Sequence, residues 1–344
     1  MGGSDDIVPR KSDHVEIVLA GGGAQSAVES GLDGVRFEHV ALPELNVSDV
    51  SLATEFLGRR LAAPLLISSM TGGFARGASI NLRLAEAAER HGIAFAVGSQ
   101  RIAIEQGASV GLDRSIRRLA PSIPVYANLG AAQLVLGYGI DEARRAVDLV
   151  EADALIIHLN PLQESVQRNG DQNWRGVLAA IERVAAALSK PVIVKEVGFG
   201  ISGRIARQLA EVGVAAVDVA GAGGTNWALV EGARAADPEA AAVAAAFAGW
   251  GIPTATALRD VRAACPDLPL IGSGGIRNGV DAAKAIRLGA DLVGMAAGLL
   301  APAAQSAEAI DAALRVVVGQ LRIACFCTRS RTLADLRRAP LLAT

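Results

Sequence analysis

The sequence predicts an α/β protein built as a single (β/α)8 TIM barrel, with an N-terminal arm and an extended insertion after the sixth strand. Short β-branched runs alternate with stretches of helical period, and eight such runs can be counted along 344 residues. This alternation is typical of repeated βα units around a parallel sheet. Eight units are the number that closes such a sheet into a barrel.

The eight predicted strands are short runs of Val, Ile, Leu and Ala. They are residues 64–69, 94–99, 125–130, 154–159, 192–197, 215–220, 268–273 and 292–297. Amphipathic stretches of helical period lie between them, at residues 80–91, 141–151, 174–188, 202–212, 254–264 and 280–288. A doubly wound open sheet is the alternative, but the Gly-x-Gly-x-x-Gly turn that usually follows its first strand is missing.

Two segments fall outside the repeat. They are the arm, up to about residue 60, and the connection at residues 221–267, which is much longer than a usual βα unit. Such excursions often carry functional residues. We therefore divide the chain into an N-terminal arm (1–60), a barrel (61–330) and a C-terminal tail (331–344).

Composition and charge exclude several classes of protein. A net charge of -2 and a pI near 6.1 provide no global basic field for nucleic acid or an anionic membrane. The polar N-terminus (residues 1–13) has no apolar core like that of a signal peptide, so a cytosolic protein is expected. Three cysteines, Cys265, Cys325 and Cys327, argue against a disulfide framework, and we expect buried or idle thiols rather than a metal site.

Polar residues and glycines gather where the predicted strands end. In a (β/α)8 barrel the interior is packed with side chains, and the chemistry lies on the loops at the C-terminal ends of the strands. Seven of the eight ends carry hydrogen-bonding side chains or glycines, at residues 68–73, 98–101, 128–130, 158–164, 195–198, 221–225 and 273–277. Singly, each could only cap a helix or permit a tight turn. Jointly, they predict one ligand site on one rim.

Small residues on this rim predict phosphate binding. The glycines after the seventh strand and the pair Ala296-Ala297 after the eighth lie where barrels commonly bind phosphate. Gly224-Thr225 is a second candidate anion site, so a phosphorylated cofactor is suggested. Lys195 ends an apolar strand, where its charge is costly unless it meets a ligand. A salt bridge with Glu196 is the alternative.

The end of the fourth strand resembles a substrate site. His158, Asn160, Gln163 and Glu164 stand within seven residues that Pro161 interrupts. Glu164 is a hard oxygen ligand suited to a Mg2+ ion that also bridges phosphate oxygens. One carboxylate is not a complete metal site, so a diphosphate and water would supply the other ligands. The alternative for Glu164 is an exposed loop carboxylate.

A short cationic cluster lies in the arm. Arg10, Lys11 and His14 form it, and together with Arg101 they could neutralise a diphosphate. Most often such a cluster is only part of a solvated tail, and that alternative stays open.

Taken in series, the motifs resemble one family, the type 2 isopentenyl diphosphate isomerases, from about Arg10 to the end of the barrel. They are Arg-Lys-x-x-His at 10–14, Met-Thr-Gly-Gly at 70–73, Gly-Ser-x-Arg at 98–101, Asn-Leu-Gly at 128–130, the run 158–164, Val-Lys-Glu-Val-Gly at 194–198, Gly-Gly-Thr-x-Trp at 223–227 and Ser-Gly-Gly-Ile-Arg at 273–277. Each is weak alone, but the series covers nearly the whole chain.

The resemblance implies a cofactor, a metal and a reaction. These are FMN, Mg2+, NADPH as a reductant, and interconversion of isopentenyl and dimethylallyl diphosphate without net redox change. It also implies a substrate-binding arm, an FMN-binding barrel, and a homotetramer or higher homo-oligomer. Lys195 beside a flavin could hold negative charge on the reduced pyrimidine ring.

The same likeness assigns residues. FMN would contact Ser68, Ser69, Met70, Thr71, Ser99, Asn128, Lys195, Ala220, Thr225, Gly275, Ile276, Arg277, Ala296 and Ala297. The substrate would meet Arg10, Lys11, His14, Ser99, Gln100, Arg101, His158, Asn160 and Gln163, with Glu164 on the metal. Some family members carry Ser where Ala220 stands, so one flavin hydrogen bond is in doubt, and Asn226 also replaces a frequent Ser.

The chemistry explains why a flavin would be needed. Shifting a double bond requires one proton delivered to carbon and another removed, and no acid–base pair of side chains is evident, since the chain has only four histidines. A reduced flavin could supply this acid–base role. Gln163 and Glu231 are the predicted catalytic side chains, which would relay or orient protons. For Glu231, a carboxylate on a helix surface is the alternative.

Three rival functions are weighed against this one. Flavin-dependent hydroxy-acid oxidases should carry a His after strand six or seven, and neither connection contains one. A nucleotide dehydrogenase of the inosine monophosphate type needs a nucleophilic Cys after strand six, whereas Cys265 lies just before strand seven. A flavin or phosphate binder without activity would have no need of Gln163 and Glu164.

Overall fold

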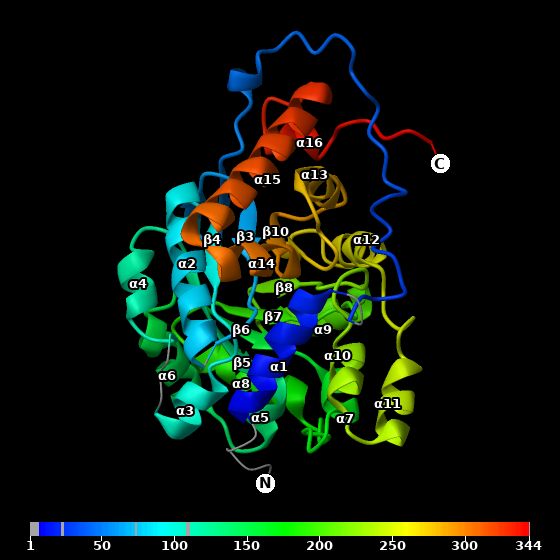
Figure 1. Ribbon diagram of the computed structural model, residues 1–344. Coiled ribbons are helices and arrows are strands. Elements are labelled where there is room, and N and C mark those ends of the chain that lie inside the picture. The colour runs from blue at the N-terminus through cyan, green and yellow to red at the C-terminus, as the bar shows by residue number, and fades with distance from the viewer. Residues whose placement is uncertain (1–6, 22–23, 73, 108–110, 344) are drawn as a thin grey trace.

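Eight parallel strands pair in chain order, and the last pairs with the first, so the sheet is a closed barrel (Figure 1). The computed structural model describes residues 7–21, 24–72, 74–107 and 111–343. The barrel strands are β3 (Leu65–Ile67), β4 (Ala94–Ala96), β5 (Val125–Gly130), β6 (Ala154–His158), β7 (Val192–Lys195), β8 (Ala216–Asp218), β9 (Leu270–Gly272) and β10 (Leu292–Met295). Each lies within a predicted run, so the (β/α)8 prediction is confirmed and the open sheet is excluded.

Amphipathic helices surround the barrel. The predicted ones are α2 (Ala75–His91), α6 (Ile140–Val150), α8 (Val177–Ala187), α9 (Gly203–Glu211), α12 (Thr254–Ala264) and α13 (Gly279–Arg287). After β10 come α14 (Ala297–Gln305), the long α15 (Ala307–Cys327) and α16 (Leu333–Leu336). Short helices α3 (Arg101–Gln106), α4 (Ser115–Leu119), α5 (Ala131–Val135) and α7 (Pro161–Val166) follow β4, β5 and β6. Their apolar faces and the outer faces of the strands form one continuous core.

The inner faces of the strands alternate with a period of two. Leu66, Tyr126, Ile156, Ile193, Ala216 and Ile271 belong to a separate apolar cluster inside the barrel. Two residues further along each of these strands stands a polar residue. We call this set the polar layer, and its members are Ser68, Asn128, His158, Lys195, Asp218 and Ser273. The barrel therefore has an apolar interior that becomes polar at the C-terminal ends of the strands.

A hairpin closes the opposite end of the barrel. Its strands are β1 (Thr54–Phe56) and β2 (Arg59–Leu61), and Leu57 and Gly58 form the turn with φ of 47° and 75°. Phe56 and Leu61 are buried in the interior cluster. The hairpin therefore covers this end of the barrel interior with apolar side chains.

The arm packs onto the ligand end. Helix α1 (Ile7–Ala20) contacts α10 (Trp227–Arg234) and α14, and Figure 1 shows it across the ends of the barrel strands. Backbone hydrogen bonds then link residues 24–26 to residues 224–226: Ser26 N to Gly224 O at 2.9 Å and Asn226 N to Ala24 O at 2.7 Å. After the turn η2 (Val47–Asp49), the chain reaches the hairpin.

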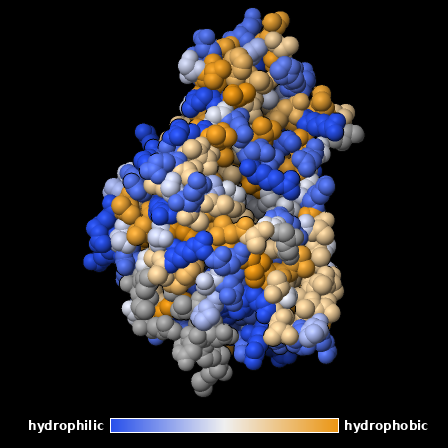
Figure 2. Space-filling view, in the orientation of Figure 1, coloured by the Kyte–Doolittle hydropathy of each residue, from blue (hydrophilic) through white to orange (hydrophobic). Residues whose placement is uncertain are grey.

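The long connection after β8 forms two extra helices before α12. They are α10 and α11 (Pro238–Ala245), and the side chains of Asn226 and Asp237 accept hydrogen bonds at their N-termini. Figure 2 shows the alanine-rich α11 corner as a pale orange, weakly apolar surface at the lower right. Within the described ranges, no helix has the length and hydropathy needed to cross a membrane.

The three thiols lie apart from the ligand end. Cys325 is buried in α15, Cys265 and Cys327 are half-buried, and all three are free. The division into arm, barrel and tail at residues 60 and 330 stays a prediction.

Candidate active site

A pocket with a cavity of about 540 Å³ opens at the C-terminal ends of the barrel strands, beside α1. Ligand sites commonly have this size. With two exceptions, every predicted site residue lines it. The list is Arg10, Lys11, His14, Ser68, Ser69, Met70, Thr71, Ser99, Arg101, Asn128, His158, Asn160, Gln163, Glu164, Lys195, Ala220, Thr225, Gly275, Ile276, Arg277, Ala296 and Ala297. Gly73 of the Met-Thr-Gly-Gly motif lies outside the described residues.

Gln100 is the first exception, and the prediction for its side chain is corrected. It is fully buried, where its Nε2 donates to Ala146 O (2.9 Å) and its Oε1 accepts from Asn128 N (2.9 Å). The amide therefore joins β5 to α6 behind the pocket wall. Ser99 lines the pocket, whereas the side chain of Gln100 points into the wall.

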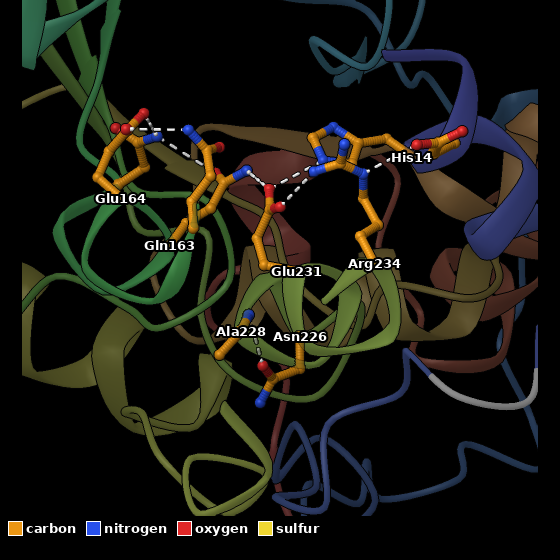
Figure 3. A network of polar contacts seen from close by, with 10 residues as sticks. His14, Gln163, Glu164, Asn226, Ala228, Glu231 and Arg234 are labelled. Carbon is orange, nitrogen blue, oxygen red and sulfur yellow. Dashed lines mark hydrogen bonds and ion pairs between the residues drawn. The ribbon is translucent and has the colours of Figure 1, made fainter. Parts of the chain in front are cut away.

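Glu231 is the second exception, because it lies behind the pocket wall at the centre of a charged network (Figure 3). Its Oε1 accepts from Gln163 Nε2 (3.0 Å) and lies 2.8 Å from His14 Nε2, and Arg234 donates to Oε2 (2.9 Å). Only 3% of Glu231 is exposed, so the alternative of a surface carboxylate is excluded. The network joins α1, α7 and α10.

This network keeps Glu231 ionised. Burial by itself raises the pKa of the carboxyl group, but the hydrogen bond and charge of His14, the Gln163 amide and the charge of Arg234 outweigh it. The resulting pKa is about 2. Glu231 is therefore an anion at neutral pH that fixes the positions of Gln163 and His14.

The polar residues after β6 are held by the short helix α7. Pro161 occupies its first turn, and Asn160 at the N-cap position donates to Glu164 Oε1 (2.9 Å) and Gln163 Oε1 (3.2 Å). Glu164 Oε2 accepts from Asp171 N (2.8 Å). Only 7% of Glu164 is exposed, so it is not the exposed loop carboxylate of the alternative.

Glu164 suits a cation. Burial raises the pKa of its carboxyl group, although the N–H of Asp171 and the Asn160 amide oppose the effect. A bound cation would stabilise the charged form. Across the described ranges, no group of three or more His, Cys, Asp or Glu residues could hold a metal ion by itself. Any metal at Glu164 would therefore share its other ligands with a substrate and water.

Three cationic side chains line the same pocket, those of Arg10, Lys11 and Arg101. Lys11 Nζ donates to the carbonyl oxygen of Ser99 (2.9 Å). Because a carbonyl carries no full charge, this contact does not neutralise the ammonium group. Burial, together with the charges of Arg10 and Arg101, lowers the pKa of Lys11 to about 7. Arg101 is held by Glu105 (2.8 Å) and Asp171 (3.0 Å). This arrangement favours an anionic ligand beside Lys11, so the arm cluster is not a solvated tail.

Five of the six residues of the polar layer line the floor of the pocket, and Asp218 is the exception. Asn128 Nδ2 donates to Val97 O (3.2 Å), which leaves its Oδ1 to accept from His158 Nδ1 (2.8 Å). Burial, with the charges of Lys195 and Lys11, lowers the pKa of His158 to about 3. The imidazole is therefore neutral in the ligand-free protein, with its proton on Nδ1 and an acceptor lone pair on Nε2.

Lys195 does not bond to the carboxylate of its neighbour. Its Nζ donates to Glu196 O (2.7 Å), and Glu196 Oε2 accepts from the backbone N–H groups of Val197, Gly198 and Phe199 at 2.6 to 2.7 Å. Glu196 thus holds the loop after β7. The alternative, a salt bridge between the side chains of Lys195 and Glu196, is therefore wrong.

One group of pocket residues offers hydrogen-bonding groups and backbone that a phosphorylated ligand could use. The buried hydroxyl oxygens of Ser68, Ser69 and Thr71 have no hydrogen-bond partner among the described residues. A Cβ on Gly274 would come within 2.1 Å of Gly221 O, so the backbone there approaches as only glycine allows. No side chain caps the N-terminus of α14 at Ala296, which leaves its first N–H groups for an anion.

Some pocket residues were not predicted from the sequence. Gln133 follows Gly130 in the first turn of α5, and its Nε2 donates to Asp171 Oδ2 (3.1 Å). Its position directly after a predicted strand end is a signal that could have found it. Gln25 lines the pocket because it bridges to Thr225, and no local pattern indicates a pairing across 200 positions.

Comparison with known proteins finds a matching family model and relatives that span nearly the full chain. The sequence model of the FMN-dependent dehydrogenases matches residues 157–343. Isopentenyl-diphosphate delta-isomerase of Stutzerimonas stutzeri (strain A1501) is 62% identical over 336 residues, covering 98% of this chain and 97% of the relative. The protein of the same name from Xanthobacter autotrophicus is also 62% identical, over 332 residues and 96% of each chain.

Solved structures with this architecture include two oxidases. The lactate oxidase of Pediococcus acidilactici has a TM-score of 0.70 and 18% identity over 99% of this chain and 92% of its own. A mandelate oxidase with a monooxide FMN adduct has a TM-score of 0.65 and 18% identity over 95% of each chain. These two show the fold alone. On the strength of its full-length relatives, the chain belongs to the type 2 isopentenyl-diphosphate delta-isomerase family.

Proposed function

We propose that this chain interconverts isopentenyl and dimethylallyl diphosphate, with reduced FMN and Mg2+ bound in the pocket. One observation carries the proposal. A single cavity combines two sets of groups: hydroxyls with no partner among the described residues, glycine turns and Lys195, and, as the second set, Lys11, Arg10, Arg101 and Glu164. The first set suits a flavin phosphate and ring, and the second suits a diphosphate with a divalent cation.

FMN would be held mainly by backbone groups. Its phosphate would lie against the turn at residues 274–277 and the N-terminus of α14, because both offer N–H groups to an anion. Ser68, Ser69 and Thr71 would donate or accept hydrogen bonds that no other described residue makes with their hydroxyls. Ala220 lines the pocket without a hydroxyl, so the hydrogen bond of a Ser at this position is lost.

The diphosphate would be bound by the cations of the arm. Lys11 and Arg10 lie on α1, which the His14–Glu231 contact holds in place at 2.8 Å. Glu164 would coordinate Mg2+, and oxygens of the diphosphate would complete the coordination together with water. Because α1 supplies these cations, we assign substrate binding to the arm and FMN binding to the barrel.

The reaction requires a proton delivered to the terminal alkene carbon and another removed from the carbon on the far side of the double bond. Reduced FMN, when bound, would supply this proton exchange. Lys195 would hold a positive charge beside the bound cofactor, and the neutral His158 would offer an acceptor. Gln163 lies on the pocket wall, and the hydrogen bond from its amide to Glu231 orients that amide. The negative charge of Glu231 would stabilise positive charge that develops on the substrate.

Two rival activities fit less well. An oxidase would need a base on the late loops, but the described residues of both connections contain no His, and the likeness to oxidases shows only the fold. A Cys nucleophile is also misplaced. Cys265 follows α12 and directly precedes β9, so it lies at the opposite end of the barrel from the pocket.

Three further assignments accompany the proposal. NADPH is the reductant that we expect to keep the flavin reduced, and a homotetramer or higher homo-oligomer is the expected assembly. A cytosolic location is also proposed. These assignments rest on the resemblance and on composition.

The test is an anaerobic assay of the purified, FMN-loaded protein with NADPH and Mg2+. We expect proton NMR to show interconversion of the two diphosphates, and we expect the activity to be lost when Mg2+ is chelated. The Glu164→Gln variant should bind flavin as the wild type does, while its isomerase activity falls at least 100-fold. The matched control is Glu182→Gln, an exposed carboxylate on α8. Bound flavin without interconversion would refute the isomerase and favour a binder or an oxidase.

A further inference from the structure

One member of the polar layer does not reach the pocket. Asp218, at the end of β8, is fully buried and absent from the pocket lining. Its Oδ1 accepts from Ser273 Oγ (2.6 Å) and Ala220 N (3.2 Å), while its Oδ2 has no hydrogen-bond partner among the described residues. A carboxylate in this position cannot contact a ligand directly, so its burial needs another explanation.

The neighbouring strand supplies one. Lys195 and Asp218 are paired in register across β7 and β8, and both side chains face the barrel interior. Burial lowers the pKa of Lys195 and raises that of Asp218, and the charge of each opposes this effect on the other. An isolated ion in this interior would be neutralised, whereas an opposite charge on the next strand favours both charged forms.

The backbone also favours an ionised carboxylate. Ala220 has a φ of 36°, in the left-handed region, which is unfavourable for a residue with a Cβ. This conformation accompanies the bond from Ala220 N to Asp218 Oδ1. Together with the Ser273 hydroxyl it provides two donors to one oxygen, and donors to a carboxylate favour its charged form.

Other charged groups around Lys195 stabilise its positive charge less than Asp218 does. Glu196 precedes the loop after β7, but its Oε2 is occupied by three backbone N–H groups, and burial raises its pKa to about 7. His158 on β6 is neutral, and Lys11 on α1 carries the same sign of charge. Asp218 is therefore the main source of negative charge beside Lys195.

We propose that Asp218 is a positioning residue that keeps Lys195 cationic beneath the flavin site. It touches neither substrate nor cofactor and acts only through Lys195, with Ser273 and the turn at Ala220 holding its carboxylate ionised. The consequence for catalysis rests on the proposed function, since it assumes that Lys195 faces the flavin. The charge coupling itself does not depend on any activity.

The chain is suited to a direct measurement, because it contains only four lysines, Lys11, Lys190, Lys195 and Lys284. We would label their ε-carbons with 13C in the FMN-loaded protein and follow each signal against pH. The Lys195 signal is identified by its loss in Lys195→Met. Lys190 and Lys284 lie outside the pocket and serve as internal controls.

The decisive comparison is wild type with Asp218→Asn, which removes the charge but keeps the size of the side chain and the acceptor for Ser273. We expect the pKa of Lys195 to fall by about one unit or more, while Lys190 and Lys284 do not move. An unchanged or higher pKa of Lys195 would overturn the proposal. A failed isomerase assay would leave this result intact, so the two failures can be told apart.

A second variant covers the case in which Asp218→Asn does not fold. Ser273→Ala keeps the carboxylate but removes one donor, which makes its ionised form less favourable. The charge of Asp218 remains and fewer donors compensate it, so the pKa of Lys195 should stay within a few tenths of a unit of the wild-type value or rise. A fall by about one unit or more in this variant would mean that the Ser273 hydroxyl, rather than the charge of Asp218, controls the charge of Lys195, and the proposal would be wrong.

Discussion

The pH dependence of diphosphate binding should report the protonation of Lys11. Burial and the charges of Arg10 and Arg101 lower its pKa to about 7, and its ammonium donates to Ser99 O at 2.9 Å. A bound diphosphate favours the charged form. Binding is therefore at full strength below about pH 7, and at higher pH it requires uptake of a proton and weakens.

The size of the effect follows from two limits. Each pH unit above the pKa weakens binding by up to about tenfold, since one unit corresponds to roughly 1.4 kcal/mol. The loss of affinity ends once the neutral Lys11 no longer binds the diphosphate. Because a charge-assisted hydrogen bond contributes about 1.5–3 kcal/mol, this value is the upper limit of the loss. We therefore expect binding to weaken roughly 10- to 100-fold between about pH 7 and pH 9.5 and then to level off.

The assay is a calorimetric titration of isopentenyl diphosphate into the FMN-loaded protein at several pH values. The last phosphate proton of the ligand ionises near pH 6, so the ligand does not change charge over this range. In Lys11→Arg the guanidinium stays charged, and affinity should become nearly independent of pH. If Lys11→Arg keeps the slope of the wild type, another group titrates and the assignment of Lys11 is refuted.

Three further predictions concern the scaffold. Tyr126→Phe should leave the free energy of unfolding unchanged or raise it by about 1 kcal/mol, because the buried hydroxyl has no described partner; a clear loss in denaturant titration would reveal one. Gly274→Ala should weaken FMN binding at least tenfold in equilibrium dialysis, since the φ of Gly274 is 100° and a Cβ would meet Gly221 O. Gly249→Ala, which has open space around it, is the control and should bind FMN normally. Equal affinities of the two variants would contradict the proposed phosphate site at residues 274–277. Phe56→Ala should lower stability by about 3–5 kcal/mol by opening the barrel floor, and a loss below about 1 kcal/mol would mean that the hairpin does not close it.

Much of the site could be predicted because the barrel gives each strand end a defined place. Once residues 154–159 are recognised as a strand, His158 must lie on the ligand rim, and the same reasoning places Asn128 and Lys195. The motif series then indicates which of these polar residues belong to one ligand site. The arm could be assigned only through the resemblance, because nothing local to Arg10 and Lys11 indicates where α1 docks.

The places of Gln100 and Glu231 could not be predicted, for physical reasons. The run at residues 94–99 forms a strand only to Ala96, so alternation could not tell that Ser99 faces the pocket and Gln100 the wall. The place of Glu231 depends on contacts with Gln163 and His14, which are 68 and 217 positions away. Separations of that length leave no periodic signal in the sequence.

The measurement that tests the central claim most directly is isotope incorporation during turnover. We would incubate the FMN-loaded protein with isopentenyl diphosphate, Mg2+ and NADPH in deuterated water without oxygen, and follow product and substrate by NMR. The account predicts dimethylallyl diphosphate carrying deuterium at the carbon that receives the proton, with the NADPH consumed only to reduce the flavin once. Conversion without deuterium, or no conversion by a protein whose bound flavin is reduced, would contradict it.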